Sequence, residues 1–234
     1  MDPSSLERSS VNVAAFFTVT VIVMLLVHRG LQRFIASGTV RGELMGDNRA
    51  FALREVGDVL SVFLVAAAIT KNCTHGVDLK RDILLSAAYG TLGLVLLEVT
   101  GAVGQRLLMG KRLAAKLAKN NLAAGLAVAC HYVAMGLLAS RAVAGSDVQG
   151  LALSLAFFGL ALVAHQALVA AFRALTTYDD SEQVEGENAA VALSYGGVSI
   201  AIALVISRAL EGDFGGWGVA LRGFFLMTSL ALLL

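Results

Sequence analysis

Seven apolar segments of near-membrane-spanning length constrain the fold of this chain more than any other feature. A helix needs about 20 mostly apolar residues to cross a bilayer. The segments are rich in alanine, leucine and valine, and they lack the alternation of apolar and polar residues that a β-barrel requires. We therefore predict an all-α, polytopic membrane helix bundle of about seven transmembrane helices, built from repeated hairpins. The predicted helices are residues 11–36, 48–70, 83–108, 121–143, 150–175, 188–210 and 216–234.

Composition narrows the class of function. Charged residues make up only 15% of the chain, and the net charge is +1. A nucleic-acid partner needs a concentrated basic face, so we expect none, and the lipid bilayer is the expected surrounding. The sequence has no C-x-x-C pair, nucleophile elbow, Walker loop, H-E-x-x-H or Rossmann glycine pattern. We therefore predict that the protein is not an enzyme and uses no cofactor.

A short motif, N-x-A-x-[AG]-L, opens the second, fourth and sixth apolar segments, at Asn48, Asn121 and Asn188. The copies are 73 and 67 residues apart (121 − 48 and 188 − 121), about two membrane crossings with their loops, which indicates repeated hairpins. An Asn at a helix start can accept hydrogen bonds from the free N–H groups of the first turn. We predict that this motif is a helix cap with a packing role. Recognition of a ligand at the three helix N-termini is the alternative.

The first and third copies of the motif match each other best, at the offset that separates Asn48 from Asn188. This offset predicts a duplicated four-helix unit, with one full unit in residues 1–145 and a second, incomplete unit in residues 146–234. An eighth helix equivalent to residues 121–143 is missing. Either the chain ends at the far interface or the sequence is incomplete. The matching pairs are Gly46/Gly186, Asn48/Asn188, Ala50/Ala190, Ala52/Ala192, Leu53/Leu193 and Gly57/Gly197.

Residues 186–197, Gly-Glu-Asn-Ala-Ala-Val-Ala-Leu-Ser-Tyr-Gly-Gly, resemble a segment of the bacterial YjfL-like membrane proteins. These belong to the domain of unknown function 350, in which a four-helix unit, often duplicated, carries such a segment at a helix start. The resemblance is strong over residues 184–205 and fair over 44–60. It is weak over 119–131, where Cys130 replaces a glycine. The resemblance implies a polytopic membrane component, and it implies no established catalytic activity.

Lysine and arginine indicate the orientation. Nine of them fall in the loops on the side of the Asn motifs and six on the opposite side. Cytoplasmic loops carry the excess of positive charge. We therefore predict a multi-pass protein of a bacterial inner membrane or an organellar inner membrane. The Asn-motif loops would lie on the cytoplasmic or matrix side.

Four ionisable residues fall near the middle of predicted helices. Asp58 and His131 lie at the same distance after an Asn of the motif (58 − 48 = 131 − 121). Glu98 and His165 lie at the same distance before the next Asn (121 − 98 = 188 − 165). His28 lies somewhat past the middle of the first helix. A charge at the bilayer midplane costs about 2.5–3.5 kcal/mol on insertion scales, so such groups face the bundle interior and pair.

This polar layer has two interpretations. Carboxylates and imidazoles at one depth can form a path for protons or a small cation, and we predict a membrane protein that moves or gates such ions through the layer. The same groups can instead lock helices together by hydrogen bonds. The alternative function is a structural or accessory subunit that forms a homo-oligomer or assembles with other membrane subunits through its Ala/Gly-rich faces. We expect no metal site, because no H-x-x-x-H or E-x-x-H ligand pair occurs.

Overall fold

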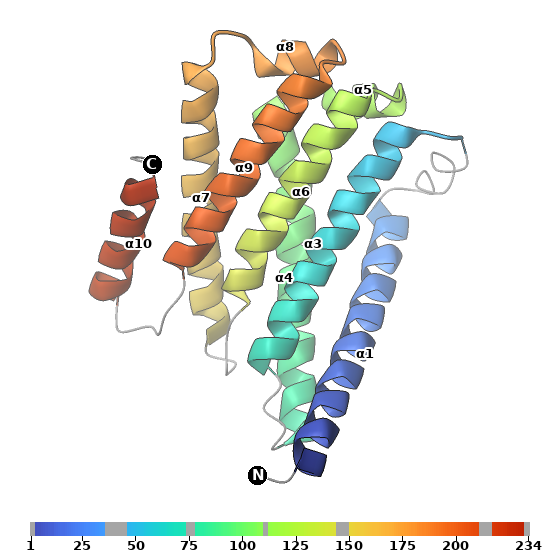
Figure 1. Ribbon diagram of the computed structural model, residues 1–234, viewed down its shortest axis with the longest axis vertical. Helices are drawn as coiled ribbons and strands as arrows, with labels where there is room; N and C mark the ends of the chain where they lie inside the picture. Colours follow the sequence, from blue (N-terminus) through green and yellow to red (C-terminus); the bar gives the residue numbers. More distant parts are fainter. Residues whose placement is uncertain are drawn as a thin grey trace.

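The computed structural model contains long helices that run side by side and two short ones at one end (Figure 1). It describes residues 3–35, 46–73, 78–109, 112–143, 150–210 and 217–231. These ranges contain helices and no strand, which confirms the predicted all-α class. The long helices are α1 (Pro3–Ile35), α3 (Arg49–Cys73), α4 (Leu79–Met109), α6 (Leu122–Ala142), α7 (Gly150–Leu175), α9 (Ala189–Ala209) and α10 (Trp217–Ala231). The short helices are α5 (Leu113–Ala118) and α8 (Asp180–Glu185).

Five of the described helices are long and apolar enough to cross a membrane. They carry the spans Ala14–Gln32, Leu79–Gly101, Leu122–Ala142, Gly150–Leu175 and Ala189–Ala209. The chain therefore fits a multi-pass membrane protein, but the predicted number of about seven transmembrane helices is not confirmed. Helix α3 places Arg54, Glu55 and Asp58 in its first three turns. Helix α10 has 15 residues in the described part, a length of about 22 Å against a hydrocarbon core of about 30 Å.

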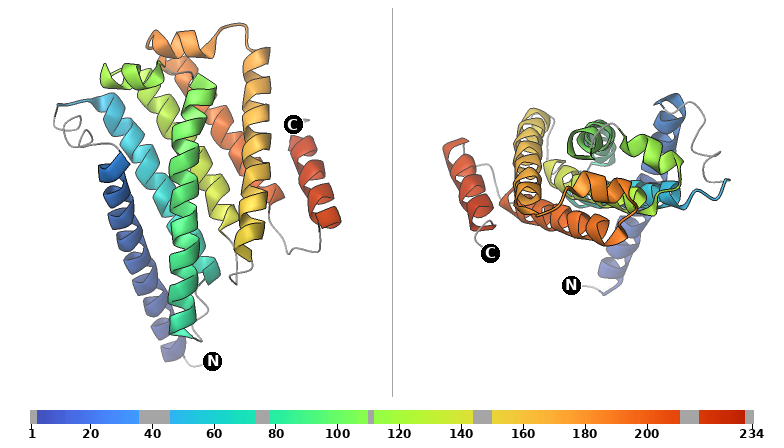
Figure 2. Two further views of the ribbon diagram at one scale, coloured as in Figure 1. Left: turned by 180° about the vertical axis from the view of Figure 1, so that it is seen from behind. Right: turned by 90° about the horizontal axis from the view of Figure 1, so that it is seen from above.

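The three helices that follow the Asn motifs, α3, α6 and α9, form one layer with α6 in the centre (Figure 1). Helix α4 packs against α3 and α6, and α7 packs against α6 and α9, so these two helices cover the layer from behind (Figure 2). Helix α1 lies beside α3 and also contacts α4, while α10 contacts α9 on the opposite edge of the layer. The short helices α5 and α8 lie at the end where α3, α6 and α9 begin (Figure 1).

Small residues let the helices of this layer approach closely. A Cβ atom added at Gly57 would lie 2.5 Å from the backbone of Ala129, and one added at Gly125 would lie 2.5 Å from the carbonyl oxygen of Ala50. Such contacts leave no room for a side chain, so α3 and α6 meet backbone to backbone. Close approach through small residues is typical of helix pairs in membranes, where lipid competes for every apolar surface.

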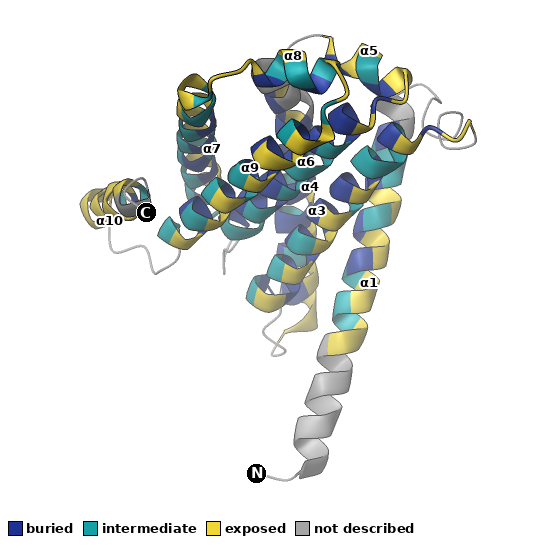
Figure 3. Ribbon diagram, turned by 45° about the horizontal axis from the view of Figure 1, so that its top comes forward, coloured by how far each residue is buried: buried dark blue, intermediate teal, exposed yellow. Residues whose placement is uncertain are grey.

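Burial follows this arrangement. Helix α6 is covered on most of its surface, whereas α10 and the outer faces of α1 and α7 carry exposed apolar side chains (Figure 3). Leu26 on α1, Val163 on α7 and Val219 on α10 are each about two-thirds exposed. Continuous apolar surface of this kind suits contact with lipid chains rather than water.

Candidate functional site: a buried histidine between two carboxylates

The imidazole of His28 joins two carboxylates from two other helices. Its Nε2 atom lies 3.2 Å from Oδ2 of Asp58 on α3, and its Nδ1 atom lies 2.6 Å from Oε1 of Glu98 on α4. His28 and Asp58 are fully buried, and the Glu98 side chain is 16% exposed. One ring therefore contacts an acid at each of its nitrogens, inside the bundle.

Helix periodicity brings these groups together. Gln32 lies four residues after His28, on the same face of α1, and its Nε2 atom donates to Oδ2 of Asp58 at 2.8 Å. Oδ2 of Asp58 thus meets both the imidazole and the amide. The hydroxyl of Ser61 donates to the carbonyl oxygen of Asp58 one turn later on α3. The contacts from His28 and Gln32 hold the Asp58 carboxylate against α1.

Polar contacts continue from this site toward the end of the bundle where α3 begins. Nη1 of Arg29 donates to Oε1 of Gln32 at 3.0 Å and to Oε2 of Glu55 at 2.6 Å. Glu55 also pairs with Arg54 at 3.3 Å. Arg54 in turn donates to the hydroxyl of Tyr132 at 3.4 Å and lies over its ring. The Arg29 side chain is 40% exposed, so the series of contacts reaches the surface of the described part.

On the other side of Asp58 the buried face of α3 is apolar for more than two turns after Ser61, through Val62, Val65, Ala66 and Ile69. In the described residues of α3, the polar contacts therefore extend from the site toward the Asn-motif end of the bundle and not toward the other end.

The other two residues of the predicted layer, His131 and His165, form a second polar group. Nε2 of His131 lies 3.4 Å from the carbonyl oxygen of Thr100 on α4. Nε2 of His165 lies 3.1 Å from the carbonyl oxygen and 3.2 Å from the hydroxyl of Ser199 on α9. The two imidazoles are buried on helices α6 and α7, which pack against each other. The predicted layer is thus divided into an acidic pair, Asp58 with Glu98, and an imidazole pair.

Sequence reasoning placed His28 in the membrane but left it out of the polar layer. A signal was present, because Arg29 and Gln32 accompany His28 within four residues of an otherwise apolar span. Three polar residues at positions i, i+1 and i+4 mark one polar face of a helix, and such a face needs a partner inside the bundle.

The same three side chains could hold a metal ion. One ligand atom each from His28, Asp58 and Glu98 lies within 4.8 Å of the others. A nitrogen and two carboxylate oxygens suit a divalent transition ion. A single ion, however, takes only one nitrogen of an imidazole, whereas the two nitrogens of His28 contact different acids. The contacts thus match a relay between two carboxylates more closely than a chelate, and the absence of a metal site stays a prediction.

The Asn residues of the motif lie at the helix starts. The side-chain oxygens accept from the N–H of the residue three positions later, at distances of 2.9, 2.9 and 3.3 Å. The residue just before each Asn has a left-handed backbone with a φ of 54, 60 or 67°. The Asn residues are Asn48, Asn121 and Asn188. The repeated unit is therefore a left-handed residue followed by a helix cap.

Two of these caps also join successive hairpins. Nδ2 of Asn48 donates to the carbonyl oxygen of Leu117, and Nδ2 of Asn121 donates to that of Val184, both at 2.9 Å. Leu117 and Val184 each lie four residues before the Asn of the following repeat. Asn188 donates instead to the side chain of Gln183, within its own repeat. The motif thus links the first repeat to the second and the second to the third.

Comparison with known protein families identifies a match over both halves of the chain. The profile of the Domain of Unknown Function DUF350 matches residues 5–143 and, a second time, residues 146–234. Two matches in succession are consistent with the predicted duplicated unit. They do not bear on the name of the YjfL-like proteins. No curated protein and no solved structure matches the chain.

Proposed function

Since the chain belongs to the DUF350 family, whose description names no activity, we propose a function from the site itself: the protein moves protons across the membrane through His28. The observation that carries this proposal is the contact of one buried imidazole with a different carboxylate at each nitrogen. An imidazole so placed can accept a proton at one nitrogen and release one from the other.

The proton step is balanced by the three groups. The O–H bond of a protonated Glu98 breaks as its proton passes to Nδ1 of His28, and the ring becomes an imidazolium. The N–H bond at Nε2 then breaks as its proton passes to the Asp58 carboxylate. The ring is left as the other neutral tautomer, and a proton exchange or a rotation of the ring restores the first.

The contacts from Gln32 through Arg29 to Glu55 place polar groups between Asp58 and the end of the bundle where α3 begins. Because an amide and a guanidinium do not release protons, the proton would leave Asp58 for water that these polar groups stabilise. Fixed polar groups replace water around a charge in the low-dielectric interior. A small cation that replaces the protons would bind the same carboxylates, so an experiment must show whether the protein transports protons or a cation.

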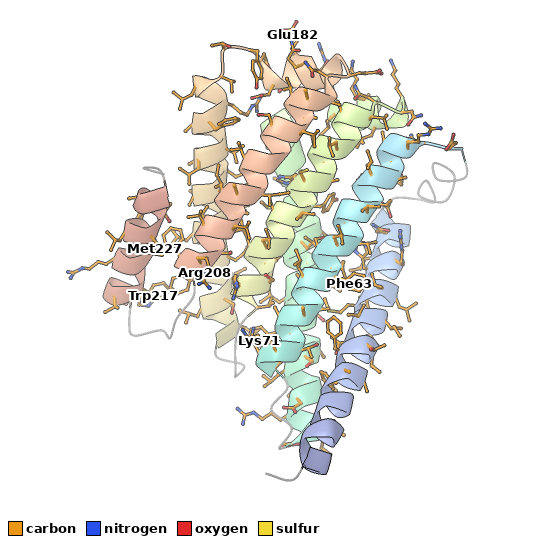
Figure 4. The ribbon with its side chains drawn as sticks, viewed as in Figure 1. Phe63, Lys71, Glu182, Arg208, Trp217 and Met227 are labelled. Atoms are coloured by element: carbon orange, nitrogen blue, oxygen red, sulfur yellow. The ribbon has the colours of Figure 1, made fainter. Side chains whose placement is uncertain are left out.

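Proton movement is tested in liposomes that contain the purified protein and a trapped pH-sensitive dye, with a membrane potential imposed by potassium and valinomycin. We expect acidification faster than in protein-free liposomes, and loss of this difference in Glu98→Gln, Asp58→Asn and His28→Gln. Glu182→Gln is the matched control, because Glu182 is an exposed carboxylate on α8, far along the chain from the site (Figure 4). If sealed liposomes show no protein-dependent acidification, the proposal is wrong. If flux follows a sodium or potassium gradient alone, that cation is the transported ion instead.

A second candidate function, that of a structural or accessory subunit, is favoured by the outer face of α9. Ala190, Ser194, Gly197 and Ala201 are exposed on one stripe of this helix. The equivalent positions of α3, Ala50 and Gly57, are those that contact α6 backbone to backbone. Small residues four apart in a span pack against another helix. A stable oligomer in mild detergent, lost in Gly197→Leu, is expected if this function holds, and a lone monomer counts against it.

A further inference from the structure

A basic pocket lies at the end of the bundle opposite the Asn caps. It has a volume of about 470 Å³ and lies between the C-terminal ends of α3, α6 and α9. Lys71 and Arg208, which mark two of its sides, are drawn near the lower ends of α3 and α9 in Figure 4. The lining residues are Leu64, Ala67, Ala68, Lys71, Asn72, Leu137, Ser140, Arg141, Leu204, Ser207, Arg208 and Leu210.

Each of the three helices contributes the same kinds of side chain to this pocket. Leu64, Leu137 and Leu204 lie at one and the same distance after the Asn of their own helix (64 − 48 = 137 − 121 = 204 − 188). Arg141 and Arg208 also share one distance (141 − 121 = 208 − 188), and Lys71 lies one turn further along its helix. The repeat therefore places a leucine and then a cation at similar depths three times over. The pocket is a product of this repetition, as the Asn caps are at the other end.

Every charged side chain among the described residues that line the pocket is basic. The C-terminal ends of helices favour cations, because their last carbonyl groups carry partial negative charge. The amide of Asn72 adds a neutral hydrogen-bond donor, whereas the hydroxyls of Ser140 and Ser207 donate to the carbonyl oxygens of Leu137 and Leu204 in their own helices. Three cations with a neutral amide suit a phosphate group, which accepts several hydrogen bonds and carries negative charge.

The apolar part of the lining distinguishes a lipid from a free anion. Leu137 and Leu204 belong to the membrane spans of α6 and α9, and Leu204 is 48% exposed. The pocket thus passes from cations at the helix ends to partly buried leucines and to the exposed Leu204 on α9. We infer that this pocket binds an anionic phospholipid, with the phosphate at Lys71, Arg141 and Arg208 and an acyl chain along the leucines. Basic pockets between transmembrane helices are suited to anionic headgroups.

The pocket is separate from His28, so the proposal of lipid binding does not depend on the proposal of proton movement. The test uses the full chain, delipidated in mild detergent and titrated with phosphatidylglycerol, phosphatidylcholine or inorganic phosphate, with bound molecules counted by native mass spectrometry. We expect phosphatidylglycerol to bind at least roughly ten times more tightly than phosphatidylcholine. Each cation near a membrane surface contributes roughly five-fold to the binding of an anionic lipid, so the triple variant Lys71→Gln, Arg141→Gln, Arg208→Gln should lose roughly 100-fold.

Two further variants make the result specific. The charge-conserving variant Lys71→Arg, Arg141→Lys, Arg208→Lys should keep the preference for phosphatidylglycerol. A matched control, Lys80→Gln, Arg81→Gln, Arg222→Gln, removes three exposed cations outside the pocket and should keep it as well. Equal binding of the two lipids by the wild-type chain, or an equal loss in the control, would overturn the inference. Binding of inorganic phosphate as tight as that of phosphatidylglycerol would overturn the lipid assignment.

Discussion

Replacing Asn121 by alanine tests whether the repeated motif is a structural link between hairpins. The side chain is buried, its oxygen accepts from Ala124 N–H at 2.9 Å, and its amide donates to the carbonyl oxygens of Val184 at 2.9 Å and Glu185 at 3.2 Å. Loss of a helix cap costs about 1 kcal/mol. Loss of each hydrogen bond to a carbonyl costs about 1 kcal/mol more. We therefore expect Asn121→Ala to lower the free energy of unfolding by about 2–3 kcal/mol.

Asn188 supplies the comparison within the same chain. Its cap bond is longer, at 3.3 Å, and within the described part of the chain its amide donates to the side chain of Gln183 alone, which can turn to water. Asn188→Ala should therefore cost only about 1 kcal/mol. Asn48 makes a cap bond and donates to the carbonyl oxygen of Leu117 in the next repeat, so Asn48→Ala should lower stability more than Asn188→Ala.

The measurement is unfolding in mixed micelles with increasing denaturing detergent, followed by circular dichroism for the wild type and the three variants. The expected result is a larger loss of stability in Asn121→Ala and Asn48→Ala than in Asn188→Ala. Equal losses at Asn121 and Asn188 would refute the role of the cross-repeat bonds. Unchanged stability at all three, with changed ion or ligand binding, would favour recognition of a ligand by the motif.

Two other predictions concern packing and pH. Gly125→Ala should destabilise the protein by about 1–3 kcal/mol, because the added Cβ would lie 2.5 Å from the carbonyl oxygen of Ala50. A Cβ at Gly159 would meet no atom within 4 Å, so Gly159→Ala should be neutral or stabilising in the same detergent-unfolding assay. Burial raises the pKa of the Asp180 carboxyl above its ordinary value of 3.8, against the opposing effect of the Arg173 guanidinium. The stability that this shift contributes is present below that ordinary value and is lost as the pH rises through the folded-state pKa. As the pH rises from about 4 toward neutrality, the melting temperature of Asp180→Asn should therefore rise relative to that of the wild type. A difference in melting temperature that stays constant with pH would contradict this.

The long helices were predictable because each needs an apolar run. The prediction of 150–175 matches α7, and that of 188–210 lies within a residue of α9 at each end. The first helix begins at Pro3 rather than residue 11, because polar residues before the apolar run continue the helix, and hydropathy does not detect them. The six-residue α8 has no apolar run. Its only signal is Asp179, which accepts from the N–H groups of Ser181 and Glu182 as a cap.

The site was predictable in depth but not in its contacts. Distances along the chain from the Asn residues placed Asp58 and Glu98 at one level. They could not show that α1 lies against both α3 and α4. His28 lies three residues closer to Asn48 than Glu98 lies to Asn121 (48 − 28 against 121 − 98). This difference is nearly one helical turn. Distance from the next Asn alone therefore predicts a different depth for His28 than for the carboxylates that it contacts.

The two polar groups of the bundle occupy equivalent places in the repeat. Asp58 and His131 share one position after an Asn, and their respective partners Glu98 and His165 share one position before the next Asn. In both cases a helix that follows an Asn meets the first helix of the next hairpin, so each polar group is completed across a boundary between repeats. Among the described residues, only the acidic pair has a third ionisable group, His28, between its members, together with contacts that reach the partly exposed Arg29. If duplication created two equal sites, the first has gained the residues on which the proposed proton movement depends, while the two imidazoles of the second contact the carbonyl oxygens of Thr100 and Ser199. Substituting His165 should therefore alter stability and leave flux unchanged, whereas substituting His28 should abolish flux.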